Sequence, residues 1–279
     1  MRGAILALAA VVLLQQPPLR VSARARAVRP GEVVVLEIAG GDSAAAVHVR
    51  AFDRDVPVYT VADGGRRALV GIDLDVRPGT YDASIDAGGA HAAYALVVAR
   101  RAFRTRTLTV DPAFVTPPES ARERIDREAK LLDQIWRASS SDRQWSAPFV
   151  RPVAEPANSA FGTRSVFNGQ PRSAHGGADF LSPAGTPIHA PNAGRIVLAR
   201  DLYFSGNTVV IDHGLGLFSM LAHLSAIDVH EGDAVEADQR IGLVGATGRV
   251  TGPHLHWAVR AGGARVDPLS LLAVLGREP

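Results

Sequence analysis

Side chains that could bind a metal ion gather in the last third of the chain. They fall in three short stretches and number five: His175, Asp179, His223, His254 and His256. The chain has nine histidines, and four of them lie in these stretches. The other five occur singly, and we expect them to be structural or exposed: His48, His91, His189, His213 and His230.

Two of the stretches have the spacing of one face of an extended strand, where residues two or four apart point the same way. His254 and His256 would therefore enter one cavity, with Leu255 and Trp257 facing a core on the other side. The four-residue separation of His175 and Asp179 has the same effect. The glycines between that pair, at positions 176 and 177, would leave an approaching ion uncrowded.

Imidazole nitrogen and carboxylate oxygen are ligands that zinc prefers in tetrahedral sites. A catalytic zinc ion has three protein ligands and keeps its fourth position for water. One aspartate and four histidines exceed that number, so at least one histidine remains for proton transfer. The residues predict a catalytic zinc (Zn2+) site without deciding which histidines bind the metal.

The three stretches resemble the lysostaphin-type (LytM-domain) zinc metalloendopeptidases of peptidoglycan. That family has His-x-Gly-x-Asp, then a His-Leu-type motif, then His-x-His, all present here in order. The text around them is also similar, and the resemblance covers about residues 147–272. It includes Phe161-Gly-Thr-Arg164, Phe167-Asn-Gly169, Gly206–Gly214 and Gly245–Trp257.

The resemblance implies roles for each motif position. The zinc ligands would be His175, Asp179 and His256, and His223 and His254 would flank the attacking water. Some family members have a tyrosine shortly before the first ligand that helps to hold the oxyanion. None occurs at that place here, and Asn168 or Arg172 could take its role near the substrate.

The implied activity is hydrolysis of peptide crosslinks in bacterial cell-wall peptidoglycan, with His223 or His254 moving the proton. No H-E-x-x-H motif occurs, so a glutamate base of the thermolysin type is not expected. The alternative is a non-catalytic LytM-type activator of a cell-wall amidase, and the complete motif set favours the enzyme. Of the two crosslinks that family members cleave, glycine–glycine and D-alanine–diaminopimelate, we favour the second. In secreted bacteriolysins of this family an SH3-type wall-targeting domain follows the catalytic domain. We see no such domain after the catalytic stretch here.

Composition limits the other classes of function. A net charge of +2 over 279 residues gives no reason to expect nucleic-acid binding. The chain has no cysteine, which excludes disulfides, thiolate zinc sites and a lipid anchor on cysteine. Hydrophobic residues make up 47%, enough for a sizeable core.

The chain is expected to begin with a signal peptide over residues 1–27. Ala4 to Leu14 is an apolar run of eleven residues after a positive start, which fits export but is too short for a membrane span. Cleavage could follow Ala25 or Ala27, although the arginines fit a cleavage motif poorly, and the alternative is an uncleaved anchor or an N-terminal helix. After cleavage the protein would be periplasmic or secreted, without a stable membrane span.

Periodicity predicts a mainly β protein of two domains. Apolar residues alternate in residues 68–76 and 81–87, and with turns between them they indicate an immunoglobulin-like β-sandwich over residues 28–112. We expect it to be a spacer or docking module, open to a protein partner, without a role in the chemistry. Residues 145–279 would be the peptidase, an antiparallel sheet ending in a short helix.

A helical linker should join the domains over residues 113–144. Thr116 and Glu119 have the spacing of a capping box, with proline at the first helical position. Ile125, Ala129, Leu132 and Trp136 then form one apolar stripe, which should pack on one of the domains.

Overall fold

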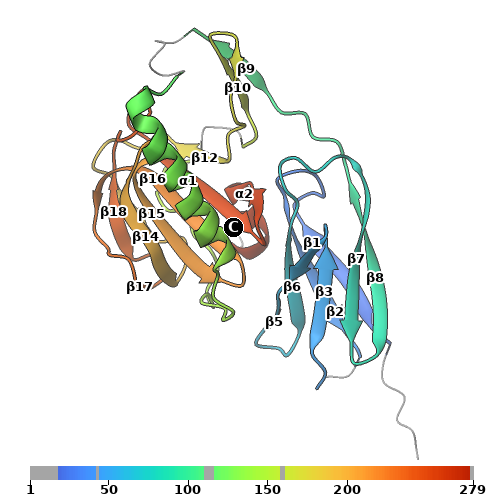
Figure 1. Cartoon of the computed structure of the whole chain (residues 1–279). Coiled ribbons are helices and arrows are strands. Elements are labelled where there is room, and N and C mark those ends of the chain that lie inside the picture. The colour runs from blue at the N-terminus through green and yellow to red at the C-terminus, as the bar shows by residue number, and fades with distance from the viewer. Residues whose placement is uncertain (1–17, 42–43, 110–115, 158–160, 277–279) are drawn as a thin grey trace, which may run out of the picture.

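Two β-rich bodies lie side by side in the computed structural model of the chain (Figure 1). The structure describes residues 18–41, 44–109, 116–157 and 161–276. The chain is mainly β, as predicted, and in the two large bodies all strand pairs are antiparallel. Within the described residues no helix is long and apolar enough to cross a membrane.

The N-terminal body is a sandwich of two four-stranded sheets, ordered β1-β2-β6-β5 and β4-β3-β7-β8. Alternate residues of both sheets fill one apolar core, including Leu36, Ile72 and Ile85, which are fully buried. The strands are β1 Arg20–Ala25, β2 Val33–Ala39, β3 Val47–Ala51, β4 Arg54–Val56, β5 Val58–Thr60, β6 Arg66–Gly71, β7 Gly79–Ala87 and β8 Ala90–Val98.

The predicted start of this domain at residue 28 is wrong. Strand β1 pairs with β2 at six positions, from Arg20 with Ala39 to Ala25 with Val34. The stretch that resembles a cleavage motif alternates small apolar and polar residues, and its apolar positions face the sandwich core. Cleavage after Ala25 or Ala27 would remove this strand. Residues 1–17, which hold the apolar run, lie outside the described part of the chain.

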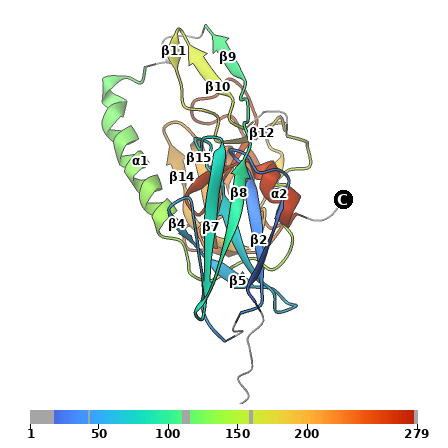
Figure 2. The same cartoon turned by 90° about the vertical axis from the view of Figure 1, so that its right-hand side faces the viewer.

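The predicted end at residue 112 is also wrong. After β8 the chain leaves the sandwich, and β9 (Thr105–Leu108) pairs in parallel with β10 (Arg164–Phe167), which is followed by β11 (Gln170–Pro171). These three strands form a separate small sheet, seen at the top of Figure 2. A segment of the inter-domain connection therefore lies beside the stretch that leads to His175.

The C-terminal body is built on a nine-stranded antiparallel sheet, with central order β12-β19-β16-β15-β14-β17. Strand β18 joins β16 to β13, and β20 pairs with β19. The elements are β12 Gly177–Phe180, β13 Pro187–His189, β14 Gly194–Leu202, β15 Gly206–Gly214, β16 Leu217–Ile227, β17 Ala234–Val235, β18 Arg240–Val244, β19 Leu255–Ala261, β20 Ala264–Val266 and helix α2 Pro268–Leu275.

Helix α1 (Arg122–Arg137) follows a 3-10 turn, η2 (Glu119–Ala121), and crosses one face of this sheet. Leu132 and Trp136 pack on it, with the Trp136 ring 5.3 Å from that of Phe218. The predicted capping box is wrong, because neither helical segment has a side-chain cap at its start. Ala129 is exposed, so the apolar stripe is narrower than predicted.

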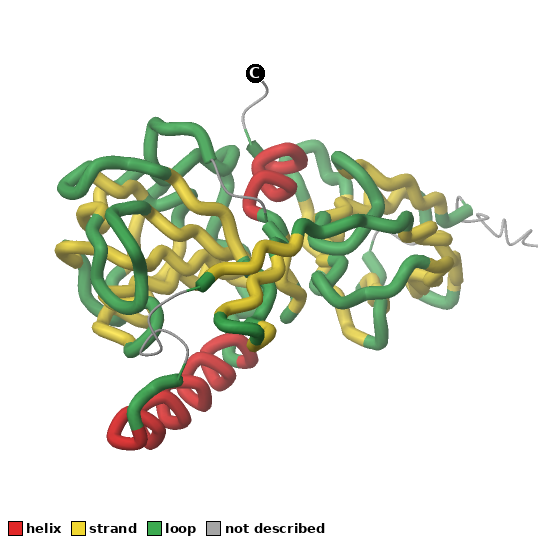
Figure 3. The backbone as a smooth tube through the Cα atoms, turned by 90° about the horizontal axis from the view of Figure 1, so that it is seen from above, coloured by secondary structure: helices red, strands yellow, loops and turns green. Residues whose placement is uncertain are grey.

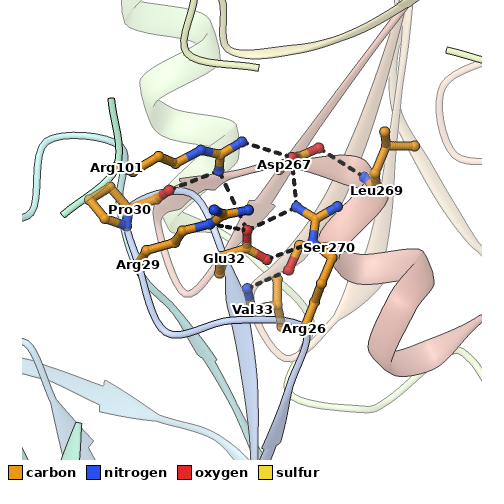
Figure 4. A network of polar contacts seen from close by, with 9 residues as sticks. All are labelled: Arg26, Arg29, Pro30, Glu32, Val33, Arg101, Asp267, Leu269 and Ser270. Atoms are coloured by element: carbon orange, nitrogen blue, oxygen red, sulfur yellow. Dashed lines mark hydrogen bonds and ion pairs between the residues drawn. The ribbon is translucent and has the colours of Figure 1, made fainter. Parts of the chain in front are cut away.

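A polar network joins the two bodies around helix α2, which lies between them in Figure 3. The fully buried carboxylate of Glu32 accepts hydrogen bonds from Arg26 at 2.9 and 3.0 Å. Arg26 also donates to Asp267, the N-cap of α2, at 2.8 Å, and Arg101 donates to the same carboxylate at 3.3 Å (Figure 4). Ser270 of α2 accepts from the backbone of β2 at 2.8 Å.

A second set of contacts extends this interface. The Arg265 guanidinium donates to Asp73 and Asp75 of the sandwich, each at 2.7 Å. The rings of Tyr59 and Trp145 meet edge to face at 5.7 Å. One apolar cluster includes residues of both bodies, so the sandwich is packed on the peptidase as a fixed part of the molecule.

Candidate metal centre

Strand register brings the predicted ligands together. On β19, His256 lies opposite Asp179 of β12 on one side and opposite Ala222 of β16 on the other. Leu255 and Trp257 point to the other face and are fully buried, with Trp257 6.4 Å from the Phe180 ring. The predicted alternation along residues 254–257 is confirmed by this burial pattern.

Three donor atoms form a nearly equilateral triangle. The Nε2 atom of His175 lies 3.0 Å from Oδ1 of Asp179 and 3.1 Å from Nδ1 of His256. The remaining side, from His256 Nδ1 to Asp179 Oδ1, is 2.8 Å. Ligands bound to one tetrahedral zinc ion lie about 3.3 Å apart. The triangle therefore needs only a slight expansion to hold zinc, and its two nitrogens and one oxygen suit that metal.

The electrostatics of Asp179 favour metal binding. Burial alone would raise its pKa, but hydrogen bonds from His175 and His256 lower the pKa well below its usual range. The carboxylate is therefore ionised at neutral pH, which is the state that a metal requires of its ligands.

Gly177 has a packing role that the sequence did not predict. A Cβ atom there would lie 2.4 Å from the Trp257 carbonyl oxygen and 2.8 Å from Cε1 of His256. The position is therefore needed for the close approach of β12 to the His256 ring. Gly176 has open space around its Cβ position, and crowding of an ion by a side chain at either glycine stays a prediction.

His223 reaches the site from a strained backbone conformation. Its φ is 68°, in the left-handed region that few residues other than glycine adopt. Its ring lies 4.8 Å from that of His254 and 6.0 Å from that of His256. His223 and His254 therefore lie next to the group formed by His175, Asp179 and His256.

Backbone carbonyls fix the tautomers of the two histidines outside the triangle. His223 Nδ1 lies 3.0 Å from the Thr247 carbonyl, and His254 Nδ1 lies 2.9 Å from that of Gly252. A carbonyl can only accept, so each Nδ1 carries a proton, and in the neutral form of either ring Nε2 has the lone pair. Burial, followed by the nearby histidines, lowers the pKa of His223 to about 4.

The residues that hold His223 were not predicted from the sequence. Thr247 donates its hydroxyl to the Leu224 carbonyl at 2.8 Å and accepts from the backbone of Asn207 at 2.9 Å. The loops that carry Gly206 and Gly248 pack directly against each other. A Cβ atom at Gly206 would lie 2.3 Å from Thr247, and one at Gly248 would lie 2.3 Å from the backbone nitrogen of Gly206. The only sequence signal was that these glycines fall inside the stretches similar to the family.

Asn168 lies in the turn between β10 and β11, and Arg172 directly follows β11. Asn168 is exposed in the turn between β10 and β11, with a φ of 49°. Arg172 is half-buried, and its guanidinium lies 6.0 Å from the Phe167 ring. A contact of either with the reacting group stays a prediction.

Of the five remaining histidines, His213 lies in the peptidase core. It is fully buried, between the Ala193 carbonyl at 2.8 Å and the Ser219 hydroxyl at 2.9 Å. Burial lowers its pKa to about 4. It is thus a neutral, hydrogen-bonded core residue.

An antiparallel sheet with a His, Asp, His triangle and two flanking histidines defines a metallopeptidase-type centre. The sequence profile of peptidase family M23 matches residues 173–268, the segment that supplies all five side chains. A solved structure from Pseudomonas aeruginosa assigned to peptidase M23 is 32% identical, with a TM-score of 0.70. The similarity covers 88% of this chain and 96% of that one. The chain belongs to peptidase family M23.

Curated relatives match over half of this chain or less. Peptidoglycan DD-endopeptidase ShyA of Vibrio cholerae is 45% identical over 139 residues, which are 50% of this chain and 28% of ShyA. DD-carboxypeptidase/endopeptidase Mpg of Neisseria meningitidis is 43% identical over 97 residues, 35% of this chain and 22% of Mpg. The chain thus spans about a quarter of the length of these relatives.

Proposed function

We propose that this protein is a zinc-dependent endopeptidase that hydrolyses peptide crosslinks of bacterial peptidoglycan. The observation that carries the proposal is the donor triangle of His175, Asp179 and His256 with two further histidines at its edge. Names of the relatives, which include peptidoglycan DD-endopeptidases, support the substrate. The amidase-activator alternative is not favoured, because the complete ligand set would have no use in it.

The chain's own residues divide the work. His175, Asp179 and His256 would hold the metal. A bound zinc ion supplies a Lewis acid that polarises the scissile carbonyl and lowers the pKa of water toward about 7. His223 and His254 have Nε2 lone pairs beside this position, so either can accept a proton from the attacking water and pass it to the leaving amine. Once protonated, the same imidazole can donate a hydrogen bond to the oxyanion, a role also proposed for Asn168 or Arg172.

The crosslink is proposed to be D-alanine–diaminopimelate, and the DD-endopeptidase names of the relatives support this choice. Export to the periplasm or outside the cell is proposed with it, because the substrate lies there. A signal peptide cleaved before Arg20 would leave strand β1 in place.

Digestion of purified sacculi tests the proposal. The zinc-loaded protein should release crosslink-derived fragments, identified by mass, from walls with diaminopimelate crosslinks and not from walls with glycine bridges. The His254→Ala variant keeps the three donor residues and is the matched control. Its rate of fragment release should be at least about 100-fold lower than that of the parent. Equal release by parent and variant would contradict the proposed chemistry.

A further inference from the structure

Arg249 lies on an aromatic side chain near the metal centre. Its guanidinium carbon is 4.4 Å from the centre of the Phe204 ring, and its backbone N–H donates to the Phe204 carbonyl at 2.9 Å. Phe204 is one of the few large apolar side chains with substantial exposure, at 37%. Tyr203 packs edge-on against it at 5.0 Å. The ring therefore serves as a platform for the arginine.

Helix α1 fastens this platform to the body of the protein. The Glu128 carboxylate accepts from the backbone N–H of Tyr203 at 2.8 Å. Arg124, one turn earlier, donates both to Glu128 at 2.6 Å and to Asp201 at 2.7 Å. The loop that carries Phe204 is thus held from its back, which limits the movement of Arg249.

The loop that carries Arg249 also builds the catalytic site. The backbone carbonyl of Thr247, two residues earlier, accepts a hydrogen bond from the Nδ1–H of His223. The loop ends at His254, which forms an isolated bridge with Gly245. Arg249 therefore projects from the same short segment that positions both proton-transfer histidines.

Arg172 belongs to the segment between β11 and β12 that leads to the metal centre. It lies three residues before His175, and its backbone donates to Ser165 at 2.8 Å while that of His175 donates to Thr163 at 2.9 Å. Its guanidinium faces the Phe167 ring at 6.0 Å. Burial lowers the pKa of Arg249, and the nearby positive charge of Arg172 lowers it further. Two half-buried cations in proximity form an electrostatic site that favours an anion.

We propose that Arg249 and Arg172 bind a free carboxylate of the peptide substrate beside the scissile bond. A guanidinium that stacks through its face can use the N–H groups at its edge, and these match a carboxylate with two parallel hydrogen bonds. The inference rests on the proposed function and extends it to substrate choice. In a D-alanine–diaminopimelate crosslink, the carbon that bears the scissile nitrogen also bears a carboxylate, whereas a glycine bridge has none there.

The test uses two synthetic crosslinked peptides that differ only in this group, one with the carboxylate and one with a carboxamide. The zinc-loaded full chain should cleave the carboxylate peptide with a kcat/KM at least about 10-fold higher, the scale of a charge-assisted hydrogen bond. Arg249→Gln should lose about 10- to 100-fold on the carboxylate peptide, mostly in KM, and less than about 3-fold on the carboxamide.

Two further variants isolate the cause. Phe204→Leu keeps an apolar side chain but removes the ring face, and it should lose part of the preference for the carboxylate. Arg137→Gln removes one positive charge at the exposed end of α1, where Arg137 pairs with Asp133, and it should leave the preference unchanged. Equal losses on both peptides in Arg249→Gln, or an unchanged preference, would overturn the proposal.

Failure of the proposed function gives a different result. If the zinc-loaded parent cleaves neither peptide, fluorescence anisotropy still measures how tightly each labelled peptide binds. Tighter binding of the carboxylate form that is lost in Arg249→Gln would support the arginine site without the peptidase activity. Equal binding of the two peptides to the parent would refute the site.

Discussion

Two neighbouring glycines give a sharp test of the metal centre. In Gly177→Ala, the new methyl group would meet the Trp257 carbonyl oxygen at 2.4 Å, where a separation of at least 3.0 Å is needed. Strand β12 or β19 must therefore move by about 0.6 Å, which exceeds the tolerance of about 0.5 Å for a preorganised site. The same methyl group would meet His256 at 2.8 Å and push its ring away from the donor triangle.

The expected effect is at least about 100-fold weaker zinc binding, or about 2.7 kcal/mol. Gly176→Ala is the matched control, because its methyl group would enter open space, and it should bind zinc like the parent. Competition with a chromophoric chelator measures the affinity, and circular dichroism checks that each variant is folded. Zinc affinities of the two variants within about threefold of each other would refute the argument that Gly177 positions His256.

Three further predictions concern the ligands, the interface and the N-terminal domain. His256→Ala should lose zinc and activity together, whereas His254→Ala and His223→Ala should keep zinc and lose about 10²- to 10⁴-fold in turnover. Metal analysis and peptide cleavage on the same preparations check this, and zinc lost only from the His254 variant would reverse the assignment. Burial alone would raise the pKa values of Glu32 and Asp73, but hydrogen bonds from Arg26 and Arg265 lower both. Their stabilisation is therefore present above the ordinary values near 4 and is lost as pH falls through the lowered values. Urea unfolding at pH 7 and pH 3 should show this loss, and Glu32→Gln should show less of it; an equal loss in both would exclude Glu32 as a source. A chain that begins at Trp145 should bind zinc and cleave a soluble peptide but unfold at lower urea concentration, because Asp267 and Arg265 lose their partners. A folded, zinc-loaded but inert fragment would mean that the part of the chain before Trp145 contributes to the chemistry.

That His254 and His256 share one face could be predicted because strand alternation is local in sequence, whereas the choice of His175, Asp179 and His256 as ligands came from the family resemblance. His254 and His256 depend on the period of one strand, and β19 is a regular strand that preserves that period. The pairing of Asp179 with His256 needed only that two short extended stretches lie together. In a regular strand, the side of the sheet on which a side chain lies depends on its position in the alternation and little on the rest of the fold.

The domain boundaries could not be read in this way, because they depend on distant partners. Strand β1 has the small residues and arginines of a processing site, and only its pairing with β2 shows that it is structural. Strand β9 is short and wholly exposed, and it exists through parallel pairing with β10, some sixty residues away in sequence. Nor did Glu32 suggest an interface, since two charged groups of its network, Arg101 and Asp267, come from distant parts of the chain.

His223 marks the limit of strand alternation as a guide. Ala222 lies opposite His256 and so shares its face of the sheet, which in a regular strand would point His223 away from the metal centre. The register of β15 with β16 shifts here, so that one extra residue of β16 is inserted, and His223 takes its positive φ at this bulge. A bulge turns a side chain toward an adjacent site, and the left-handed conformation costs about 1–3 kcal/mol. Hydrogen bonds from its backbone to Ser205 and from its ring to Thr247 offset this cost. The histidine is thus placed by the two interlocked loops, and the strand pattern alone would have excluded it.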